Sequence, residues 1–497
     1  MEQNLLDLRE TTKLYPGVRA LDNVNFTLRE GEVHCLVGEN GSGKSTMIKI
    51  VSGVIEPEPG AHMTFDGQSM DGQSALDAIE MGIRVIYQDL ALFPNLTVKE
   101  NVAFGIYNET TGPTVNWAEV ERRAKEAMAL IGLNLNLDRK VSMLSIAEQQ
   151  QVEIARSLTG NLKLLILDEP TASLTRSEVD RLFATIAALK KRGVATLFVS
   201  HKLNEIFEIA ERVTVFRDGR KIGVYQPDEL DHGKLVYLMT GEKVEIEPPE
   251  PIAQDAEELL RVENLSRDGN YKDISFDLRE GEILGITGRL GSGRTELALS
   301  LFGMNPAESG EVYLNGEKLF LRNNSDATRA GIAYVPENRL TQGLVMAQSI
   351  RTNLTVTVLK SFLNKVGLIN PDKVNGTANR WVRELSIKIP DLNAAVQTLS
   401  GGNAQKIVLS KWLATDPKVL ILDEPTVGID VLAKDSVHSF VKRLAASGIG
   451  IILISDEVHE VLYNSHRVLV MDRGRILDEV FPGPKAEEQL LERFNLA

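Results

Sequence analysis

Residues 38–45 read GENGSGKS, and they follow the apolar run 33–37 and precede a helical pattern that starts at Thr46. The stretch fits the pattern Gly-x-x-x-x-Gly-Lys-Ser, in which glycines let backbone N–H groups close around a phosphate at a helix N-terminus. A chance glycine-rich turn is the alternative, and the apolar run before the loop argues against it. The sequence therefore predicts a phosphate-binding loop made of Gly38, Glu39, Asn40, Gly41, Ser42, Gly43, Lys44, Ser45 and Thr46.

Two acidic residues complete this first candidate site. In a loop of this kind, we expect Lys44 to reach the β- and γ-phosphates of a nucleotide and Ser45 to bind Mg²⁺. Residues 164–169 read LLILDE, an apolar strand that ends in two carboxylates. Asp168 is expected to hold Mg²⁺, and Glu169 is expected to act as general base on an attacking water. Solvated acids at a strand end are the alternative, but the same pair recurs at 423–424.

The chain contains an internal repeat. Residues 29–32 and 279–282 both read REGE, an offset of 279 − 29 = 250, and residues 167–171 and 422–426 both read LDEPT, an offset of 422 − 167 = 255. A nearly constant offset over most of each half indicates two copies of one domain. The acidic stretch 241–257 contains three prolines and is expected to be a linker, which places the domains at 1–240 and 258–497.

Apolar runs rich in Val, Ile and Leu predict strands that are buried on both faces of a parallel sheet. They occur at residues 33–37, 164–167 and 194–199 in the first copy and at 283–287, 419–422 and 451–454 in the second. Helical patterns lie between these runs, for example over residues 145–160. The fold class is therefore expected to be α/β.

Composition limits the partners. The net charge of −14 argues against a nucleic-acid scaffold, which would need clustered Lys and Arg. The one cysteine, Cys35, lies in an apolar run and is predicted to be a buried strand residue. Spanning a bilayer takes about 20 apolar residues, and no uninterrupted run approaches that length. The protein is expected to be soluble, or held at a membrane only by partners.

The phosphate loop of the second copy differs in one residue. Residues 288–295 read GRLGSGRT, so the glycines remain but Arg294 replaces the lysine. A planar guanidinium is bulkier than an ammonium and does not fill the same position. This loop is expected to bind nucleotide through Gly288, Gly293, Arg294 and Thr295 but to catalyse poorly, if at all.

Residues 399–403 read LSGGN and precede the second Asp–Glu pair. Together with the phosphate loops, they resemble the motifs of ABC ATPases, and the resemblance covers nearly the whole chain. The tandem arrangement, the arginine loop and the short linker are most similar to the ATPase subunit of ribose/galactose-type monosaccharide importers. The resemblance implies two P-loop ABC ATPase domains, each with a mixed sheet core and a helical signature subdomain, and it implies ATP and Mg²⁺ as ligands.

The resemblance also implies further roles. Tyr15 would stack on adenine, although simple packing is an alternative for a lone aromatic residue. Gln88 would touch Mg²⁺ and the attacking water, and His201 would contact the γ-phosphate. Two segments, 173–175 and 428–430, would form the D-loops that run across the interface between the domains. In the family, each nucleotide lies between the phosphate loop of one domain and the signature of the other, which in this chain includes Ser400, Gly401 and Gly402.

The two copies depart from the family pattern in different motifs. In the second copy, Glu337 and Asp456 stand where the first has Gln88 and His201, and Leu265 stands at the 250 offset from Tyr15. In the first copy the signature lacks its two glycines and reads LSIAE, residues 144–148. Side chains at Ile146 and Ala147 would hinder close approach to phosphate, and the carboxylates of Glu148, Glu337 and Asp456 would be unfavourable near it.

The sorting leads to a functional hypothesis. The intact first phosphate loop would pair with the intact second signature, giving one hydrolysing site and one site that holds nucleotide. The resemblance implies a peripheral subunit at the cytoplasmic face of the membrane, with paired halves, two transmembrane permease subunits and an extracytoplasmic substrate-binding protein. Alternatives are a nucleoside or autoinducer cargo, a ribosome-associated tandem ATPase, or a DNA-repair ATPase. The last two would need a basic helical linker or a coiled-coil or zinc insertion, and the sequence shows none.

Overall fold

The computed structural model describes residues 4–87, 90–104, 115–171, 174, 176–200, 202–242, 248–253, 255–289, 291–429, 431–483, 486 and 490. The chain divides into two compact units, Met1–Val244 and Glu245–Ala497. Within the described part, no helix combines the length and the apolar character that crossing a membrane requires. The exact limits of the linker expected at 241–257 stay a prediction.

The first unit is built on two sheets. The central six-stranded sheet has the order β10-β9-β3-β8-β7-β6, and it is parallel except for β10. Its strands are β3 (Val33–Val37), β6 (Ile83–Ile86), β7 (Leu164–Asp168), β8 (Ala195–Val199), β9 (Arg212–Arg217) and β10 (Arg220–Tyr225). The smaller antiparallel sheet, β2-β1-β4-β5, contains β1 (Asn4–Tyr15), β2 (Val18–Arg29), β4 (His62–Phe65) and β5 (Gln68–Ser69). The helices are α1 (Lys44–Val51), α2 (Ala75–Met81), α3 (Val98–Val102), α4 (Trp117–Leu130), α5 (Ile146–Ser157), α6 (Arg176–Lys190), α7 (Leu203–Ile209) and α8 (His232–Thr240).

The second unit repeats this plan. Its six-stranded sheet has the order β16-β17-β18-β13-β19-β20, from β13 (Ile283–Gly288), β16 (Ile332–Val335), β17 (Val419–Asp423), β18 (Gly450–Ile454), β19 (Arg467–Asp472) and β20 (Arg475–Val480). Its antiparallel sheet contains β11 (Glu258–Arg267), β12 (Tyr271–Arg279), β14 (Ser309–Leu314) and β15 (Glu317–Leu319). The helices are α9 (Arg294–Leu301), α10 (Asn324–Ala330), α11 (Ile350–Thr355), α12 (Pro371–Glu384), α13 (Gly401–Leu413), α14 (Val431–Ala446) and α15 (Val458–Asn464).

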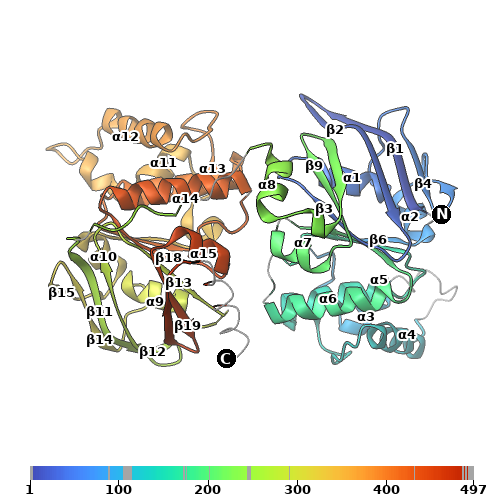
Figure 1. Ribbon diagram of the computed structural model, residues 1–497, viewed down its shortest axis with the longest axis horizontal. Helices are drawn as coiled ribbons and strands as arrows, with labels where there is room; N and C mark the ends of the chain where they lie inside the picture. Colours follow the sequence, from blue (N-terminus) through green and yellow to red (C-terminus); the bar gives the residue numbers. More distant parts are fainter. Residues whose placement is uncertain are drawn as a thin grey trace. The chain divides into compact units, whose positions relative to one another are not determined.

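The predicted α/β class and the predicted parallel strands are confirmed. Every residue of β3, β8 and β18 is buried, as expected for strands covered on both faces. Cys35 is fully buried in β3, also as expected. In the first unit, α3, α4 and α5 share a small apolar core of their own, and Figure 1 shows α3 and α4 at the end of the unit that faces away from β1 and β2. In the second unit α11, α12 and α13 take the equivalent place.

A buried ion pair ties the start of β3 to β9. Glu32 is 6% exposed, and Arg212 donates to its carboxylate from Nε at 2.5 Å and from Nη2 at 3.0 Å. In the second unit Arg467 bonds Glu282 in the same way, with Nε at 2.6 Å. The repeated REGE segments thus contain the partners of the repeated arginines. Burial alone would raise the pKa of Glu32, but hydrogen bonds from His34 and Arg212 outweigh burial and lower the pKa to about 2.

The pair predicts an acid-sensitive contribution to stability. Because the folded pKa of Glu32 lies below its ordinary value of 4.5, the contribution is present above about pH 4.5 and is lost as the pH falls toward 2. Glu32→Gln leaves the Arg212 charge without its partner and should lower the free energy of unfolding near neutral pH by about 3 kcal/mol. Urea unfolding at several pH values measures both effects. Glu30→Gln, at an exposed neighbour, is the control, and equal unfolding of the two variants would contradict the assignment.

Candidate nucleotide-binding sites

The first phosphate loop follows β3 directly, and two of its glycines are required by close packing. Gly38 has φ +156°, and a Cβ there would lie 2.4 Å from the Phe216 carbonyl oxygen. Gly43 has φ +102°, and a Cβ there would lie 2.5 Å from the Ala20 carbonyl oxygen. A side chain at either position would therefore displace backbone. The loop presents Asn40, Gly41 and Ser45 at the surface, whereas Glu39 and Thr46 are half-buried.

Lys44 points back into this loop. Its ammonium is buried and donates to the carbonyl oxygens of Gly38 at 2.7 Å and Glu39 at 2.9 Å. Burial lowers its pKa, and the nearby carboxylates of Glu169 and Asp168 act in the opposite direction. The Oγ of Ser42 is also buried, and no partner for it exists in the described part of the chain. A cation and an unpaired hydroxyl inside a curled loop suit an oxyanion such as phosphate.

The acidic pair lies at the carboxyl end of β7. Glu169 adopts φ +50°, a left-handed conformation that is uncommon outside glycine, and its N–H donates to the Val199 carbonyl at 2.9 Å. Asp168 is half-buried, and among the described residues no side chain hydrogen-bonds its carboxylate. Burial, and then the charge of Glu169, raise the pKa of Asp168. The free oxygens of Asp168 and the exposed hydroxyl of Ser45 form a donor set that fits Mg²⁺.

Two predicted catalytic residues, Gln88 and His201, lie outside the described residues, as do Ser173, Thr175 and Asp430 of the predicted D-loops. Their roles stay predictions. Tyr15 is the last residue of β1, and its side chain is 42% exposed. Its stacking on adenine also stays a prediction.

A buried carboxylate that was not singled out from the sequence joins the segments that follow two strands. Glu205 is buried and accepts from Thr171 Oγ1 at 2.6 Å and Ser200 Oγ at 3.0 Å. It thereby joins the segments that follow β7 and β8. In the second unit Glu460 accepts from Thr426 at 2.6 Å and from Ser455 at 2.9 Å. The constant offset of 460 − 205 = 255 would have revealed these residues.

The second phosphate loop keeps the same backbone but a different cation environment. Gly293 has φ +95°, and a Cβ on Gly288 would lie 2.1 Å from the Met471 carbonyl oxygen. Arg294 is buried, with Nη1 3.8 Å from Glu424 Oε1. That Nη1 makes no hydrogen bond within the described chain. The larger guanidinium therefore reaches the second acidic pair, whereas the ammonium of Lys44 stays with its own loop.

The second acidic pair is more enclosed than the first. Glu424 has φ +48° and accepts from the Asp456 N–H at 2.8 Å. Burial, and then the charge of Asp456, raise the pKa of Glu424, although Arg294 acts in the opposite direction. Asp423 is fully buried, and burial raises its pKa to about 6. A carboxyl that is protonated at neutral pH cannot accept a proton from water and does not bind a cation well.

The two signature segments begin their helices differently. Ser145 caps α5, and its Oγ accepts from the Glu148 N–H at 3.2 Å while the Glu148 carboxylate accepts from the Ser145 N–H at 2.8 Å. This reciprocal capping box holds the Glu148 charge at its own helix N-terminus, near Arg139 at 3.4 Å. Ser400 precedes α13 without such a cap, and its Oγ accepts only from Asn403 Nδ2, at 2.9 Å, among the described residues.

The glycines of the second signature are also required within their own unit. A Cβ on Gly401 would lie 3.0 Å from the Gly428 carbonyl oxygen, and one on Gly402 would lie 2.8 Å from the Ala433 side chain. Arg339 donates to the Gly428 carbonyl at 2.9 Å and also bonds the Val427 carbonyl. The start of α13 is thus packed closely against the segment that follows the acidic pair.

The comparison of Leu265 with Tyr15 was wrong. In the strand register, Leu265 pairs with Ile274 in the way that Thr11 pairs with Val24. The hairpin of β11 and β12 ends at the pair Arg267–Tyr271, whereas β1 and β2 continue to the pair Tyr15–Val18. The second hairpin is therefore shorter, and it has no counterpart of Tyr15. The fixed 250 offset failed because residues are deleted within this hairpin.

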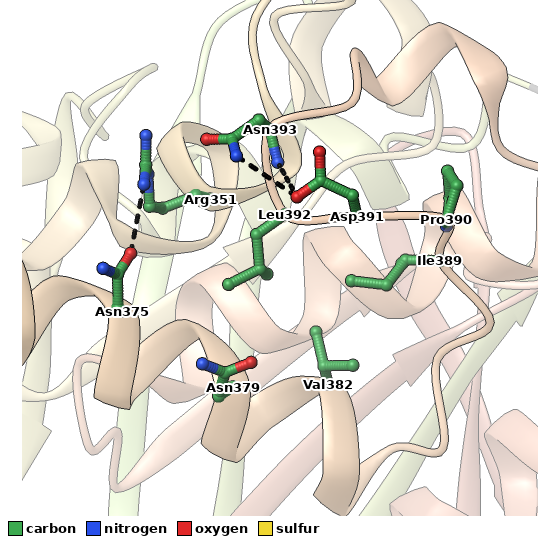
Figure 2. Close-up of a pocket in the computed structure, with 9 residues that line it drawn as sticks. All are labelled: Arg351, Asn375, Asn379, Val382, Ile389, Pro390, Asp391, Leu392 and Asn393. Atoms are coloured by element: carbon green, nitrogen blue, oxygen red, sulfur yellow. Dashed lines mark hydrogen bonds between the residues drawn. The ribbon is translucent and has the colours of Figure 1, made fainter.

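A cavity of about 620 Å³ lies in the helical part of the second unit. Figure 2 shows that its polar side chains face one another: Arg351 donates to Asn375 at 3.1 Å, and Asn393 donates to Asp391 at 3.2 Å. None of the predicted site residues that the structure describes lines it.

Comparisons with known proteins agree with this geometry. A family model described as ABC transporter matches residues 21–172 and 271–427. A ribose import ATP-binding protein of Caldanaerobacter subterraneus subsp. tengcongensis is 40% identical over 98% of each chain. A xylose import ATP-binding protein of Thermoanaerobacter pseudethanolicus is 41% identical over 98% of each chain.

Among solved structures, an archaeal ribosome recycling factor in complex with a ribosomal stalk protein aligns with a TM-score of 0.65 and 22% identity. The alignment covers 98% of this chain and 92% of that one, and the likeness concerns the fold alone. The two family matches and the full-length relatives lead to one conclusion: the chain belongs to the ABC transporter family and carries the family's domain twice.

Proposed function

We propose that the chain is the ATP-hydrolysing subunit of an ABC importer for a monosaccharide of the ribose or xylose kind. The names of full-length relatives that are 40–42% identical support this cargo. The observation that carries the proposal is the sorting of competent groups between the copies. The first copy has Lys44 in its loop and an open Asp168 beside Glu169, and the second has the uncapped Ser400.

The proposed catalytic site combines these groups across the two copies. ATP would lie between the first phosphate loop and the second signature, where Lys44 neutralises the β- and γ-phosphates and Ser400 donates to the γ-phosphate. Ser45, Asp168 and Gln88 would hold Mg²⁺, which supplies further charge neutralisation when bound. Glu169 would accept the proton of the attacking water, and His201 would contact the γ-phosphate.

Nucleotide then couples to transport by holding the halves together. Because each ATP contacts both copies, binding would favour their closed pairing, and hydrolysis with phosphate release would weaken it. The cycle would drive two transmembrane permease subunits between inward- and outward-facing states. The chain would sit peripherally on the cytoplasmic face of the membrane, and an extracytoplasmic protein would deliver the sugar.

The other composite site is proposed to hold nucleotide without turnover. It would combine the second phosphate loop with the first signature, where Ile146 and Ala147 replace the glycines and the Ser145–Glu148 box occupies the helix N-terminus. A helix N-terminus that is already capped by a carboxylate offers a phosphate less positive potential.

Two alternative functions remain to be compared with this proposal. A nucleoside or autoinducer cargo would keep the same ATPase and change only the permease and binding protein. The ribosome-associated alternative finds its likeness only in the fold, at 22% identity. Co-purification separates an importer subunit from a ribosome-associated protein: the proposal expects membrane permease subunits to copurify with the chain, and association with ribosomes instead would contradict it.

One test of the proposed function concerns the two glutamates that follow β7 and β17. Glu169→Gln removes the general base and should lower steady-state ATP turnover by about 10²-fold or more. Glu424→Gln is the matched change in the second copy and should change turnover by less than about threefold, because that carboxyl is enclosed and paired with Arg294. Turnover of the assembled transporter measures both. Similar losses in the two variants would contradict the assignment of one hydrolysing site.

Another test separates the roles of the two signature serines. Ser145→Ala removes a capping box and should lower the free energy of unfolding by about 1 kcal/mol while leaving turnover unchanged. Ser400→Ala removes no cap and should leave stability unchanged, but it should lower turnover by about tenfold because a phosphate donor is lost. Urea unfolding and ATPase assays measure the pair. A turnover loss in Ser145→Ala that matches that of Ser400→Ala would refute the proposed division.

A further inference from the structure

The aspartates that end β7 and β17 occupy the same place in the two copies but differ in their surroundings. Asp423 is completely buried, and both of its carboxylate oxygens accept hydrogen bonds. Tyr334 Oη donates to Oδ2 at 2.9 Å, and Thr295 Oγ1 donates to Oδ1 at 3.3 Å. Asp168, by contrast, is half-buried and receives no hydrogen bond from any described side chain.

The difference originates in one residue of a neighbouring strand. Tyr334 in β16 pairs with Ile421, two positions before Asp423, and Val85 in β6 pairs with Ile166, two positions before Asp168. The two residues are therefore structural equivalents. Tyr334 is 4% exposed and its ring packs against Phe302 at a centroid distance of 5.5 Å. The phenol is thus held in place against the carboxylate, and valine cannot make this bond.

This arrangement does not fit a magnesium site. Mg²⁺ demands a near-octahedral set of oxygen ligands and keeps several waters. In the second copy, both oxygens of Asp423 are engaged and inaccessible to solvent, and the Thr295 hydroxyl is turned toward that carboxylate. In the first copy Asp168 is half-buried and Ser45 is exposed, so oxygen ligands are accessible there that are engaged in the second copy.

The second loop supplies a cation from the protein instead. Arg294 is 6% exposed, and its Nη1 has no hydrogen-bond acceptor within the described chain. Ser292 Oγ, in the same loop, is likewise buried and without a described partner. A guanidinium and a hydroxyl without acceptors, next to a glycine-rich loop, are suited to the oxygens of a polyphosphate.

We propose that the second site binds its nucleoside triphosphate without needing magnesium, because Tyr334 hydrogen-bonds the Asp423 carboxylate and Arg294 neutralises the phosphates. This inference rests on the proposed function, in which the second copy holds nucleotide. Such a site would keep its nucleotide when the magnesium concentration falls low enough to empty the first site. It would also lack the cation that hydrolysis needs.

Equilibrium dialysis of the full chain tests the inference. The probe is the non-hydrolysable analogue adenylyl imidodiphosphate, in excess Mg²⁺ or in excess EDTA. The chain should bind about two analogues with Mg²⁺ and about one with EDTA, and the dissociation constant of the retained one should change by less than about threefold. Arg294→Ala should abolish the EDTA-resistant binding, whereas Lys44→Ala should leave it.

Substitutions at the two equivalent residues provide the matched variants. Tyr334→Phe keeps the ring and removes the hydrogen bond, so Asp423 becomes available and Mg²⁺ should strengthen binding at the second site by about tenfold. Val85→Tyr places a phenol beside Asp168 and should reduce the magnesium dependence of the first site. Because Tyr334→Phe is nearly isosteric, its result does not depend on whether Val85→Tyr folds.

The outcomes distinguish this inference from the function on which it rests. Two analogues per chain in Mg²⁺ and none in EDTA would overturn magnesium-independent binding but keep a nucleotide-holding second site. One analogue in Mg²⁺ and none in EDTA would overturn both, since the second copy would then hold no nucleotide. An unchanged magnesium response in Tyr334→Phe would show that Tyr334 is not the cause.

Discussion

The parallel pairing of β3 with β8 and of β8 with β7 is the constraint on which the first site depends. Parallel strands end at one edge of the sheet, so the phosphate loop after β3 and the acidic pair after β7 meet there. The N–H of Glu169 bonds the last carbonyl of β8 and holds this residue in a left-handed conformation, and Glu424 is held in the same way. Such backbone strain persists only where the surrounding structure over-determines it, and it often marks functional sites.

The scaffold is shared by the two copies, and the chemistry is changed by a few side chains. Lys44 and Arg294 follow equivalent glycines, Gly43 and Gly293. The longer guanidinium approaches Glu424, whereas the ammonium bonds carbonyl oxygens of its own loop. Val85 leaves Asp168 open, and Tyr334 closes Asp423. Each change preserves the fold because each occurs where the sheet and the loop backbone already fix the geometry. The second copy therefore keeps the backbone of the glycine-rich loop, while the contacts of its acidic pair differ from those in the first copy.

Much of the fold and of the first phosphate loop could be predicted from the sequence, because strands buried on both faces appear as apolar runs and the loop has a fixed spacing. The limits of β3, for example, were predicted without error. The short second hairpin was not, since a constant repeat offset cannot register a local deletion, and Leu265 was misplaced as a result. The charge of Glu148 was expected near phosphate, although the spacing Ser-x-x-Glu, residues 145–148, is a capping-box signal. Tyr334 gave no signal, because its role depends on a bond to a residue 89 positions away.

The central claim is that only the first copy's phosphate loop hydrolyses ATP. Orthovanadate replaces the released phosphate and traps nucleotide as a transition-state mimic, so it retains label only where hydrolysis occurs. The most direct measurement traps a photoreactive azido-ATP with vanadate in the assembled transporter and maps the vanadate-dependent label by peptide analysis. The account predicts that this label falls within residues 1–240. Comparable vanadate-dependent label within residues 258–497 would contradict it.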